Sequence, residues 1–186
     1  MDSTNTENQS VQQKKRPMTA SQRVMFVIGV LAMTAGLCIL GFFGCRKLYR
    51  EYRRQQLMKN NPVVEIADIH IKAPILEGTG QDILAKAAGH FENTGDIGKG
   101  NYCIAGHSSV LYKEYFNNLK QAEKGMEIVL YDTSKNPYSY IISDISIVEP
   151  SETWILDDFG DNRVTIVTCT DDGTQRLIVT GKLKEQ

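Results

Sequence analysis

The apolar residues of the chain follow two different patterns. Residues 24–43 (VMFVIGVLAMTAGLCILGFF) are twenty consecutive residues without a charge. At a rise of about 1.5 Å per residue, a helix of this length matches a bilayer hydrocarbon core of about 30 Å. From residue 63 onward, short runs of β-branched residues alternate with turn residues instead. The pattern predicts one transmembrane helix followed by a β-rich domain.

The β-rich part contains seven short runs that we predict to be strands and two segments with helical spacing. Seven or eight strands within about 125 residues favour an antiparallel barrel or sandwich with short covering helices. The second helical segment has apolar side chains on one face and stops before Gly125. The predicted strands are residues 63–71, 75–76, 102–105, 126–131, 138–148, 164–168 and 177–183, and the predicted helices are residues 81–88 and 112–123.

Three further segments complete the predicted organisation. Residues 1–23 are predicted to be a disordered tail, because the first sixteen hold one branched aliphatic residue and no aromatic residue. Residues 44–61 are predicted to be a helical stalk that ends at Pro62, since residues 46–60 lack glycine and proline. The folded domain then occupies residues 62–186.

The apolar run has two alternative interpretations. A cleaved signal peptide has an apolar region of about 7–15 residues followed by small residues, whereas this run is longer and ends in Phe42 and Phe43. A lipidated Cys45 is the other alternative, because the sequence F-F-G-C at residues 42–45 loosely resembles a bacterial lipobox without its usual leucine. We favour an uncleaved signal-anchor at residues 24–43.

Charge divides the chain near the end of the stalk. Residues 1–60 hold ten Lys/Arg and three Asp/Glu, and residues 61–186 hold eleven and nineteen, so the formal net charge of −1 combines a basic part with an acidic domain. Nucleic acids bind through clustered Lys and Arg, so the acidic domain argues against a nucleic-acid partner. Four basic residues precede the apolar run and six follow it, and this count alone slightly favours a cytoplasmic domain.

The cysteines and histidines do not follow a known metal-binding or disulfide spacing. Two of the four cysteines belong to the apolar run or its edge, which leaves Cys103 and Cys169 in the domain. The sequence holds no C-x-x-C, H-E-x-x-H or EF-hand motif. We predict that Cys103 is a small core residue and that His70 and His90 are surface or half-buried residues.

Reactive side chains lie where predicted strands begin or end. His107 and Cys169 each follow a strand, and Arg176 begins the next one. If Cys169 and Arg176 belong to a hairpin closed by a six-residue loop, they face each other with Cβ atoms about 5 Å apart. A guanidinium stabilises a nearby thiolate and can donate hydrogen bonds to an oxyanion, and an imidazole can transfer protons. Together the three residue types would supply the groups for nucleophilic catalysis by a cysteine, and a structural role for each of them is the alternative.

Three motifs around these residues resemble those of the sortases, the membrane-anchored cysteine transpeptidases of Gram-positive bacteria. The motifs are I-A-G-H ending at His107, V-T-I-V-T-C ending at Cys169, and R-L-I-V beginning at Arg176. The family's motifs read A-G-H, T-L-x-T-C, and R followed by an apolar strand. Ile166 stands where leucine is usual, and both side chains are apolar and similar in volume. The resemblance extends over residues 63–183.

The resemblance implies a fold and a reaction. The fold would be a closed eight-stranded antiparallel or mixed β-barrel with short covering helices, preceded by the N-terminal transmembrane helix. The substrate would be a secreted protein with an LPXTG-like sorting signal. Cys169 would attack the Thr carbonyl to form a thioester, His107 would protonate the leaving Gly amine, and Arg176 would hold the substrate or the oxyanion. Ala105 and Val167 match positions that line the family's sorting-signal groove.

The resemblance also implies partners and a location. The incoming amine would belong to a peptidoglycan precursor of the lipid II type, or to a lysine if the enzyme polymerises pili. The catalytic domain would lie outside the cell membrane and the N-terminus in the cytoplasm, against the count of basic residues. The chain resembles class A sortases most, and class D sortases have a similar size and layout.

No cofactor is expected, although some class A sortases bind calcium through acidic loop residues. Glu92, Asp96, Glu152 and Asp157 lie in comparable loops, and we assign no metal ligand among them. Two other functions stay open on the sequence alone: a membrane-tethered thiol hydrolase or protease that releases its product to water, and a membrane-tethered binding domain without catalysis.

Overall fold

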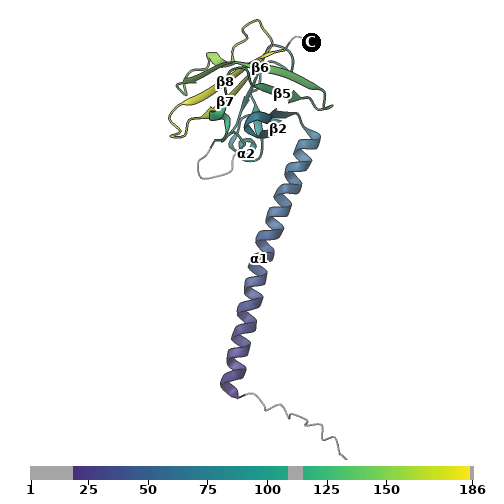
Figure 1. Ribbon diagram of the computed structural model, residues 1–186, viewed down its shortest axis with the longest axis vertical. Coiled ribbons are helices and arrows are strands. Elements are labelled where there is room, and N and C mark those ends of the chain that lie inside the picture. The colour runs from purple at the N-terminus through teal and green to yellow at the C-terminus, as the bar shows by residue number, and fades with distance from the viewer. Residues whose placement is uncertain (1–18, 109–114, 185–186) are drawn as a thin grey trace, which may run out of the picture. The chain divides into compact units, whose positions relative to one another are not determined.

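A computed structural model describes residues 19–108 and 115–184. The chain divides into two compact parts, Met1–Tyr49 and Arg50–Gln186, and each is described by itself. The first part lies mostly within one long helix, and the second part contains all of the strands (Figure 1).

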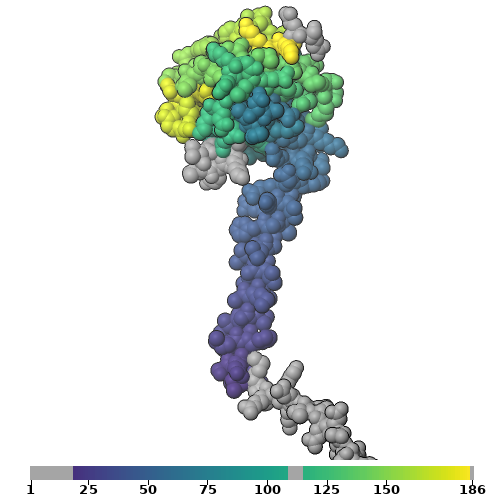
Figure 2. All heavy atoms as spheres, in the orientation of Figure 1, coloured from purple at the N-terminus to yellow at the C-terminus, as the bar shows by residue number. Residues whose placement is uncertain are grey.

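Helix α1 (Ala20–Asn60) contains the predicted membrane span and residues 44–60 of the predicted stalk without interruption. It begins at Ala20, so residues 20–23 are helical, in contrast to the predicted disorder; residues 1–18 lie outside the described residues. None of its residues is buried, and Figure 2 shows the side chains of its first turns, in purple, projecting outward. Within the described residues, α1 is the single helix long and apolar enough to cross a membrane. A helix suits that role because it satisfies its own backbone hydrogen bonds.

Eight strands form the second part, and they depart from the predicted runs at two places. The run 63–71 is divided by a short 3-10 helix, and its last residue, Ile71, begins the strand that also contains the predicted run 75–76. Residues 88–90 form a strand that the sequence pattern did not predict. The strands are β1 (Val63–Ile66), β2 (Ile71–Glu77), β3 (Ala88–His90), β4 (Asn101–Ala105), β5 (Glu127–Tyr131), β6 (Pro137–Val148), β7 (Arg163–Cys169) and β8 (Arg176–Leu183).

The strands close into a barrel in the order β1-β2-β3-β4-β7-β8-β6-β5. The β2–β3 and β4–β7 pairs are parallel, and the other neighbouring pairs are antiparallel. The predicted fold, a closed eight-stranded mixed barrel, is therefore confirmed. Closure leaves no strand edge unpaired along the barrel wall.

The connecting helices are shorter than predicted. Helix α2 (Gln81–Leu84) covers only the first half of the predicted segment 81–88, because Ala88 already belongs to β3. Of the predicted helix 112–123, residues 112–114 lie outside the described residues, and the remainder contains turns and the 3-10 helix η2 (Leu119–Gln121). The two other 3-10 helices are η1 (Ala67–Ile69) and η3 (Trp154–Leu156).

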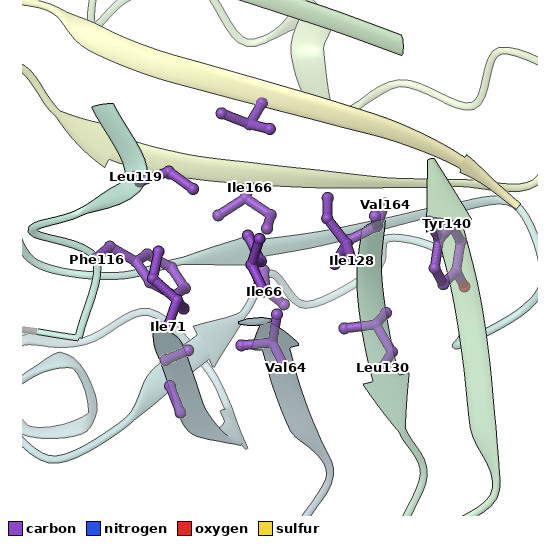
Figure 3. Close-up of a cluster of buried hydrophobic side chains, with 14 of the residues drawn as sticks. Val64, Ile66, Ile71, Phe116, Leu119, Ile128, Leu130, Tyr140, Val164 and Ile166 are labelled. Atoms are coloured by element: carbon purple, nitrogen blue, oxygen red, sulfur yellow. The ribbon is translucent and has the colours of Figure 1, made fainter. Parts of the chain in front are cut away.

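The barrel interior is filled by apolar side chains from alternate strand positions (Figure 3). This alternation follows from the two-residue period of a strand, which sends successive side chains to opposite faces. Burying one such side chain contributes about 1.5–3 kcal/mol relative to its exposed state, so the interior stabilises the wall on which the site is built. The largest fully buried side chains include Phe116, Tyr140, Ile66, Ile71, Ile104, Leu119, Ile128, Leu130, Ile142 and Ile166.

The last turns of α1 belong to the barrel part. Lys135 Nζ donates hydrogen bonds of 2.7 Å to the carbonyl oxygens of Met58 and Asn61. A cation at this position complements the negative C-terminal end of the helix dipole. Arg54 Nη2 also donates to the carbonyl oxygen of Lys72 on β2 at 3.4 Å. The barrel part therefore includes chain that precedes the predicted boundary at residue 62.

Candidate active site

The ends of three neighbouring strands bring the predicted catalytic residues to one edge of the barrel. Ala105 on β4 is paired with Val167 on the parallel strand β7. Cys169, the last residue of β7, is paired with Arg176, the first residue of β8, as the predicted hairpin requires. Parallel neighbouring strands end at the same edge of a sheet. His107, two residues after the end of β4, therefore lies beside the end of β7. The register therefore gathers the imidazole, the thiol and the guanidinium at one edge.

Alternation along the strands places these residues on the outer face of the barrel. Tyr102 and Ile104 of β4, and Val164 and Ile166 of β7, belong to the interior cluster. The residues between them consequently face outward. The outer face carries Cys103 and Ala105 on β4, Val167 and Cys169 on β7, and Arg176 and Ile178 on β8.

Two hydrogen bonds fix the residue before His107 to strand β7. The backbone N–H of Gly106 donates to the carbonyl oxygen of Val167 at 3.1 Å, and Thr168 Oγ1 donates to the carbonyl oxygen of Gly106 at 2.8 Å. Thr168 is buried, so this hydroxyl takes its partner from the protein and not from water. The backbone of His107 is thereby held against the strand that ends at Cys169.

Gly106 lies directly against the ring of Phe116. A Cβ atom at residue 106 would lie within 3.0 Å of three ring carbon atoms of Phe116. The ring is fully buried, and the backbone N–H of Phe116 donates to the carbonyl oxygen of His107 at 3.4 Å. A glycine at this position lets the aromatic side chain pack under the strand end that leads to His107.

The residues predicted to line the substrate groove, Ala105 and Val167, lie in an apolar cluster on the outer face. We call this set the outer cluster; it is separate from the barrel interior and lies next to the edge that holds Cys169. Its register pair Ala105 and Val167 links β4 to β7. The outer cluster consists of the buried residues Ile155, Val167 and Ile178 and the partly buried residues Phe91, Ala105, Val148 and Leu156.

Asn101 holds the connection between β6 and β7 against the outer face. Its Nδ2 donates to the carbonyl oxygens of Ile155 at 3.0 Å and Asp157 at 2.9 Å, and its Oδ1 accepts from Thr165 Oγ1 at 2.7 Å. The side chain is buried, so the three bonds satisfy groups that water cannot reach. Sequence reasoning missed Asn101 because its partners lie 54 to 64 residues away; the available signal was a polar residue beginning a buried strand.

The two cysteines of the barrel have opposite environments. Cys103 is fully buried, and burial raises the pKa of its thiol to about 12, which leaves it protonated at neutral pH. Cys169 is half-buried, as are His107 and Arg176. The Arg176 guanidinium donates through Nη1 to the carbonyl oxygen of Gln175 at 3.1 Å. Cys169 is therefore the barrel cysteine with access to a substrate.

The other two histidines have different surroundings. His70 is exposed at a turn, as predicted, but His90 is buried, in contrast to the prediction. Its Nδ1 lies 2.9 and 3.0 Å from the two carboxylate oxygens of Glu77, and its Nε2 lies 3.0 Å from Thr94 Oγ1. Its ring stacks on Tyr102 with 4.3 Å between the centroids. The parallel β2–β3 register, which pairs Glu77 with His90, brings these partners together.

The acidic residues considered for calcium are divided between two connections of the barrel. Glu92 and Asp96 lie between β3 and β4, whereas Glu152 and Asp157 lie between β6 and β7. Across residues 19–108 and 115–184, no group of three or more His, Cys, Asp or Glu side chains is arranged to hold a metal ion. We assign no metal ligand among these carboxylates, and the expectation that the protein needs no cofactor stays a prediction.

Comparison with known proteins identifies the family. A family model for the sortase domain matches residues 64–184, well over half of the chain. The chain belongs to the sortase family. The match begins in β1 and ends after β8, so it extends over all eight strands and includes the edge with His107, Cys169 and Arg176.

Several sortases are similar in sequence and structure. Sortase A of Streptococcus agalactiae is 38% identical over 136 residues, which cover 68% of this chain and 55% of that protein. The structure of a Clostridium perfringens sortase D5 transpeptidase is 32% identical with a TM-score of 0.62, and the match covers 73% of this chain and 89% of that one. The structure of sortase C-1 from Actinomyces oris is 30% identical with a TM-score of 0.62, covering 67% and 74% of the two chains.

The sortases that resemble this chain differ in class and length. Their names include the letters A, C and D, so the comparisons establish the family and leave the class open. The chain spans about half the length of the curated relatives it matches.

Proposed function

We propose that the chain is a cysteine transpeptidase that cleaves an LPXTG-like sorting signal between Thr and Gly and transfers the Thr carbonyl to an amine. The observation that supports it is the strand register at one barrel edge. The β7–β8 ladder pairs Cys169 with Arg176, and the parallel β4–β7 pair ends beside it at the residues before His107. This is the combination of nucleophile, oxyanion donor and acid that acyl transfer requires.

The first half of the proposed reaction forms an acyl-enzyme. The Cys169 thiolate attacks the Thr carbonyl carbon, a C–S bond forms, and the carbonyl oxygen becomes an oxyanion that the Arg176 guanidinium can hold. The intermediate collapses by breaking the C–N bond to Gly, and the protonated His107 gives its proton to the leaving amine. The product is a thioester on Cys169 and a peptide with a free amino end.

The second half transfers the acyl group. An incoming amine attacks the thioester carbonyl, the new C–N bond forms, and the C–S bond breaks with Cys169 leaving as a thiolate. Neutral His107 accepts the proton that the amine loses, so both groups return to their starting protonation states. Arg176→Lys should impair both halves, because an ammonium group cannot reproduce the planar guanidinium fork.

The outer cluster supports the proposed substrate class. An LPXTG-like signal has an apolar residue and a proline ahead of its Thr, and Ala105, Val167 and Ile178 offer apolar surface beside the edge that holds Cys169. The connection fixed by Asn101 would form one wall of this groove. We propose that the signal lies along this wall with its Thr carbonyl at Cys169.

The proposed partners act at the outer surface of the membrane. Secreted proteins would supply the sorting signal and a lipid II-type peptidoglycan precursor would supply the amine, so we propose a cytoplasmic N-terminus and an extracellular barrel. Basic residues after the span would then be held by anionic headgroups outside. Labelling of Asn60→Cys in intact cells with a membrane-impermeant thiol reagent tests this orientation. If the introduced cysteine is labelled only after the cells are opened, the barrel lies in the cytoplasm.

We propose that the reaction needs no bound metal or cofactor, with thiol, imidazole and guanidinium as its reacting groups. The loop carboxylates considered for calcium lie on the β3–β4 and β6–β7 connections. Turnover should be the same after chelation with EDTA and after calcium is added back. A large increase with calcium would assign these loops a binding role.

Mass spectrometry of the peptide products tests the proposed function. The full-length chain in detergent is incubated with an LPXTG peptide, with and without a glycine-rich amine. An amine-linked product should form with the wild type, be absent with Cys169→Ala and persist with the matched control Cys103→Ala. If the added amine leaves only the water-released product, the chain is a thiol hydrolase. If the wild type and Cys169→Ala are equally inert, the binding-domain alternative is favoured.

The same assay addresses the class. We propose class A, in line with the curated relatives named sortase A, so the LPXTG peptide should be cleaved faster than peptides substituted at any fixed signal position. A higher kcat/KM for a substituted signal would favour class D. Exclusive use of a lysine side chain as the amine would favour pilus polymerisation.

A further inference from the structure

The connection between Cys169 and Arg176 is organised around one carboxylate. Six residues join the end of β7 to the start of β8. Asp172 Oδ1 accepts hydrogen bonds from Thr170 Oγ1 at 2.6 Å and from the backbone N–H of Thr174 at 3.1 Å, and its Oδ2 accepts from Thr174 Oγ1 at 2.8 Å. One exposed side chain therefore joins the arm that leaves Cys169 to the arm that enters Arg176.

Thr170 joins the two arms of the connection where they meet β7 and β8. Its backbone N–H donates to the carbonyl oxygen of Gln175 at 3.1 Å, and its hydroxyl oxygen accepts from the backbone N–H of Gln175 at 3.1 Å. The hydroxyl has one proton, and the 2.6 Å bond to Asp172 takes it. The Gln175 carbonyl oxygen also accepts from Arg176 Nη1, so the guanidinium rests on a carbonyl that the Asp172–Thr170 pair holds in place.

The carboxylate is a permanent acceptor at neutral pH. Hydrogen bonds from Thr170 and then Thr174 lower the pKa of Asp172. Gly173 has a φ of 73°, which lets the chain turn between the two bonded arms. The connection is also tied from outside, because Lys120 Nζ lies 2.8 Å from a carboxylate oxygen of Asp171.

We propose that Asp172 is a positioning residue: through Thr170 and Thr174 it fixes the backbone between Cys169 and Arg176, and so sets the thiol relative to the guanidinium. Asp172 itself contacts neither the substrate nor the reacting atoms. The effect on turnover rests on the proposed function, whereas the effect on Cys169 reactivity does not.

The chain offers a matched control for this residue. Asp132, a half-buried residue, also closes a hairpin connection with its carboxylate, which accepts from the backbone N–H of Asn136 at 2.8 Å and from its Nδ2 at 2.7 Å. It lies between β5 and β6, beside Pro137, whereas Arg176 is paired with Val148 at the other end of β6. Twelve residues of strand, roughly 35 Å, separate the two positions.

The test compares Asp172→Ala, Asp172→Asn and Asp132→Ala in the full-length chain in detergent. Two quantities are measured: the rate at which iodoacetamide alkylates Cys169, followed by peptide mapping, and kcat and KM for amine transfer. We expect Asp172→Ala to change the alkylation rate by about threefold or more and to lower kcat about tenfold with KM nearly unchanged. Asp172→Asn retains an acceptor oxygen and should restore most of kcat, and Asp132→Ala should match the wild type in both quantities.

Three results would overturn the proposal. They are wild-type alkylation and kcat in Asp172→Ala, equal losses in Asp132→Ala, and a loss in Asp172→Ala that appears in KM alone. Failure of the wild type to transfer any peptide would contradict the proposed function instead, and the alkylation rates would still decide whether Asp172 positions Cys169.

Discussion

The hydroxyl of Thr168 donates a 2.8 Å hydrogen bond to the carbonyl oxygen of Gly106. Thr168 precedes Cys169 and Gly106 precedes His107, so this bond joins the two residues that adjoin the proposed nucleophile and the proposed acid. It lies one residue beyond the last paired residues of the parallel β4–β7 ladder. The relative position of the reactive groups therefore depends on a side-chain hydroxyl where the ladder ends.

Removing that hydroxyl should reduce both stability and turnover. Thr168→Val keeps the shape of the side chain but leaves the Gly106 carbonyl oxygen without this partner, at a cost of about 1–3 kcal/mol in the free energy of unfolding. We expect kcat to fall by about tenfold or more because His107 loses its fixed position. Urea unfolding and the amine-transfer assay measure the two effects. Thr168→Ser, which keeps the hydroxyl, should retain kcat, and equal kcat in the valine and serine variants would show that the bond does not position His107.

The contact between Gly106 and Phe116 predicts a coupled pair of substitutions. Gly106→Ala places a Cβ against the buried ring, and the overpacking should lower the free energy of unfolding by about 1–3 kcal/mol. Phe116→Leu destabilises alone by leaving unfilled space. Combined, the two changes should cost clearly less than their sum, because the smaller side chain makes room for the new methyl group. Strictly additive losses in urea unfolding would contradict the proposed contact.

The different environments of the two barrel cysteines predict selective labelling. The buried Cys103 thiol has its pKa raised to about 12, so almost none of it is thiolate at pH 8. Iodoacetamide should alkylate half-buried Cys169 in the native protein and Cys103 only after unfolding in urea. Peptide mapping distinguishes both sites from Cys38 and Cys45. Labelling of Cys103 in the native protein at the rate of Cys169 would be inconsistent with its burial.

The far end of β7 predicts a pH-dependent contribution to stability. Arg163 donates hydrogen bonds to the Asp161 carboxylate, one of them from Nη2 to Oδ2 at 2.6 Å. These hydrogen bonds lower the pKa of Asp161, and the nearby Lys182 lowers it further. Because the folded pKa lies below the unfolded one, the contribution is present above about pH 4 and is lost as the pH falls through the folded pKa.

Asp161→Asn tests that sign. At pH 7 the variant should be less stable by no more than about 1 kcal/mol, since the carboxylate is partly exposed. Toward pH 2 the difference should shrink, because the wild-type carboxyl is progressively protonated in the folded state as well as in the unfolded one. Urea midpoints at the two pH values provide the comparison. A difference that grows toward pH 2 would have the wrong sign.

Much of the barrel and the pairing at its reactive edge can be predicted from the sequence. The β-branched residues of runs such as 164–168 predict strands. The six-residue loop between two such runs predicts the pairing of Cys169 with Arg176. These features depend on residues close together in the chain. Helix α1 could be predicted for the same reason, because the apolar run and the stalk each have a helical pattern that depends only on neighbouring residues.

The missed features depend on partners far apart in the chain. Strand β3 consists of Ala88, Gly89 and His90, which have weak strand propensity and extend only because β2 and β4 pair with them. Residue 89 must also be a glycine, because a Cβ atom there would lie 3.2 Å from the backbone of Thr79. Likewise the bonds of Asn101 exist only after the β6–β7 connection has folded back over β4.

Cys169 is the residue that must hold the acyl group in the proposed mechanism. The decisive measurement is to mix the full-length chain with an LPXTG peptide without an amine, quench with acid, digest, and locate the added mass by mass spectrometry. We predict a thioester-linked adduct ending at the Thr of the peptide, on Cys169, which disappears when a glycine-rich amine is added. Amine-linked product formed without an adduct on Cys169, or with the adduct on another residue, would contradict the account.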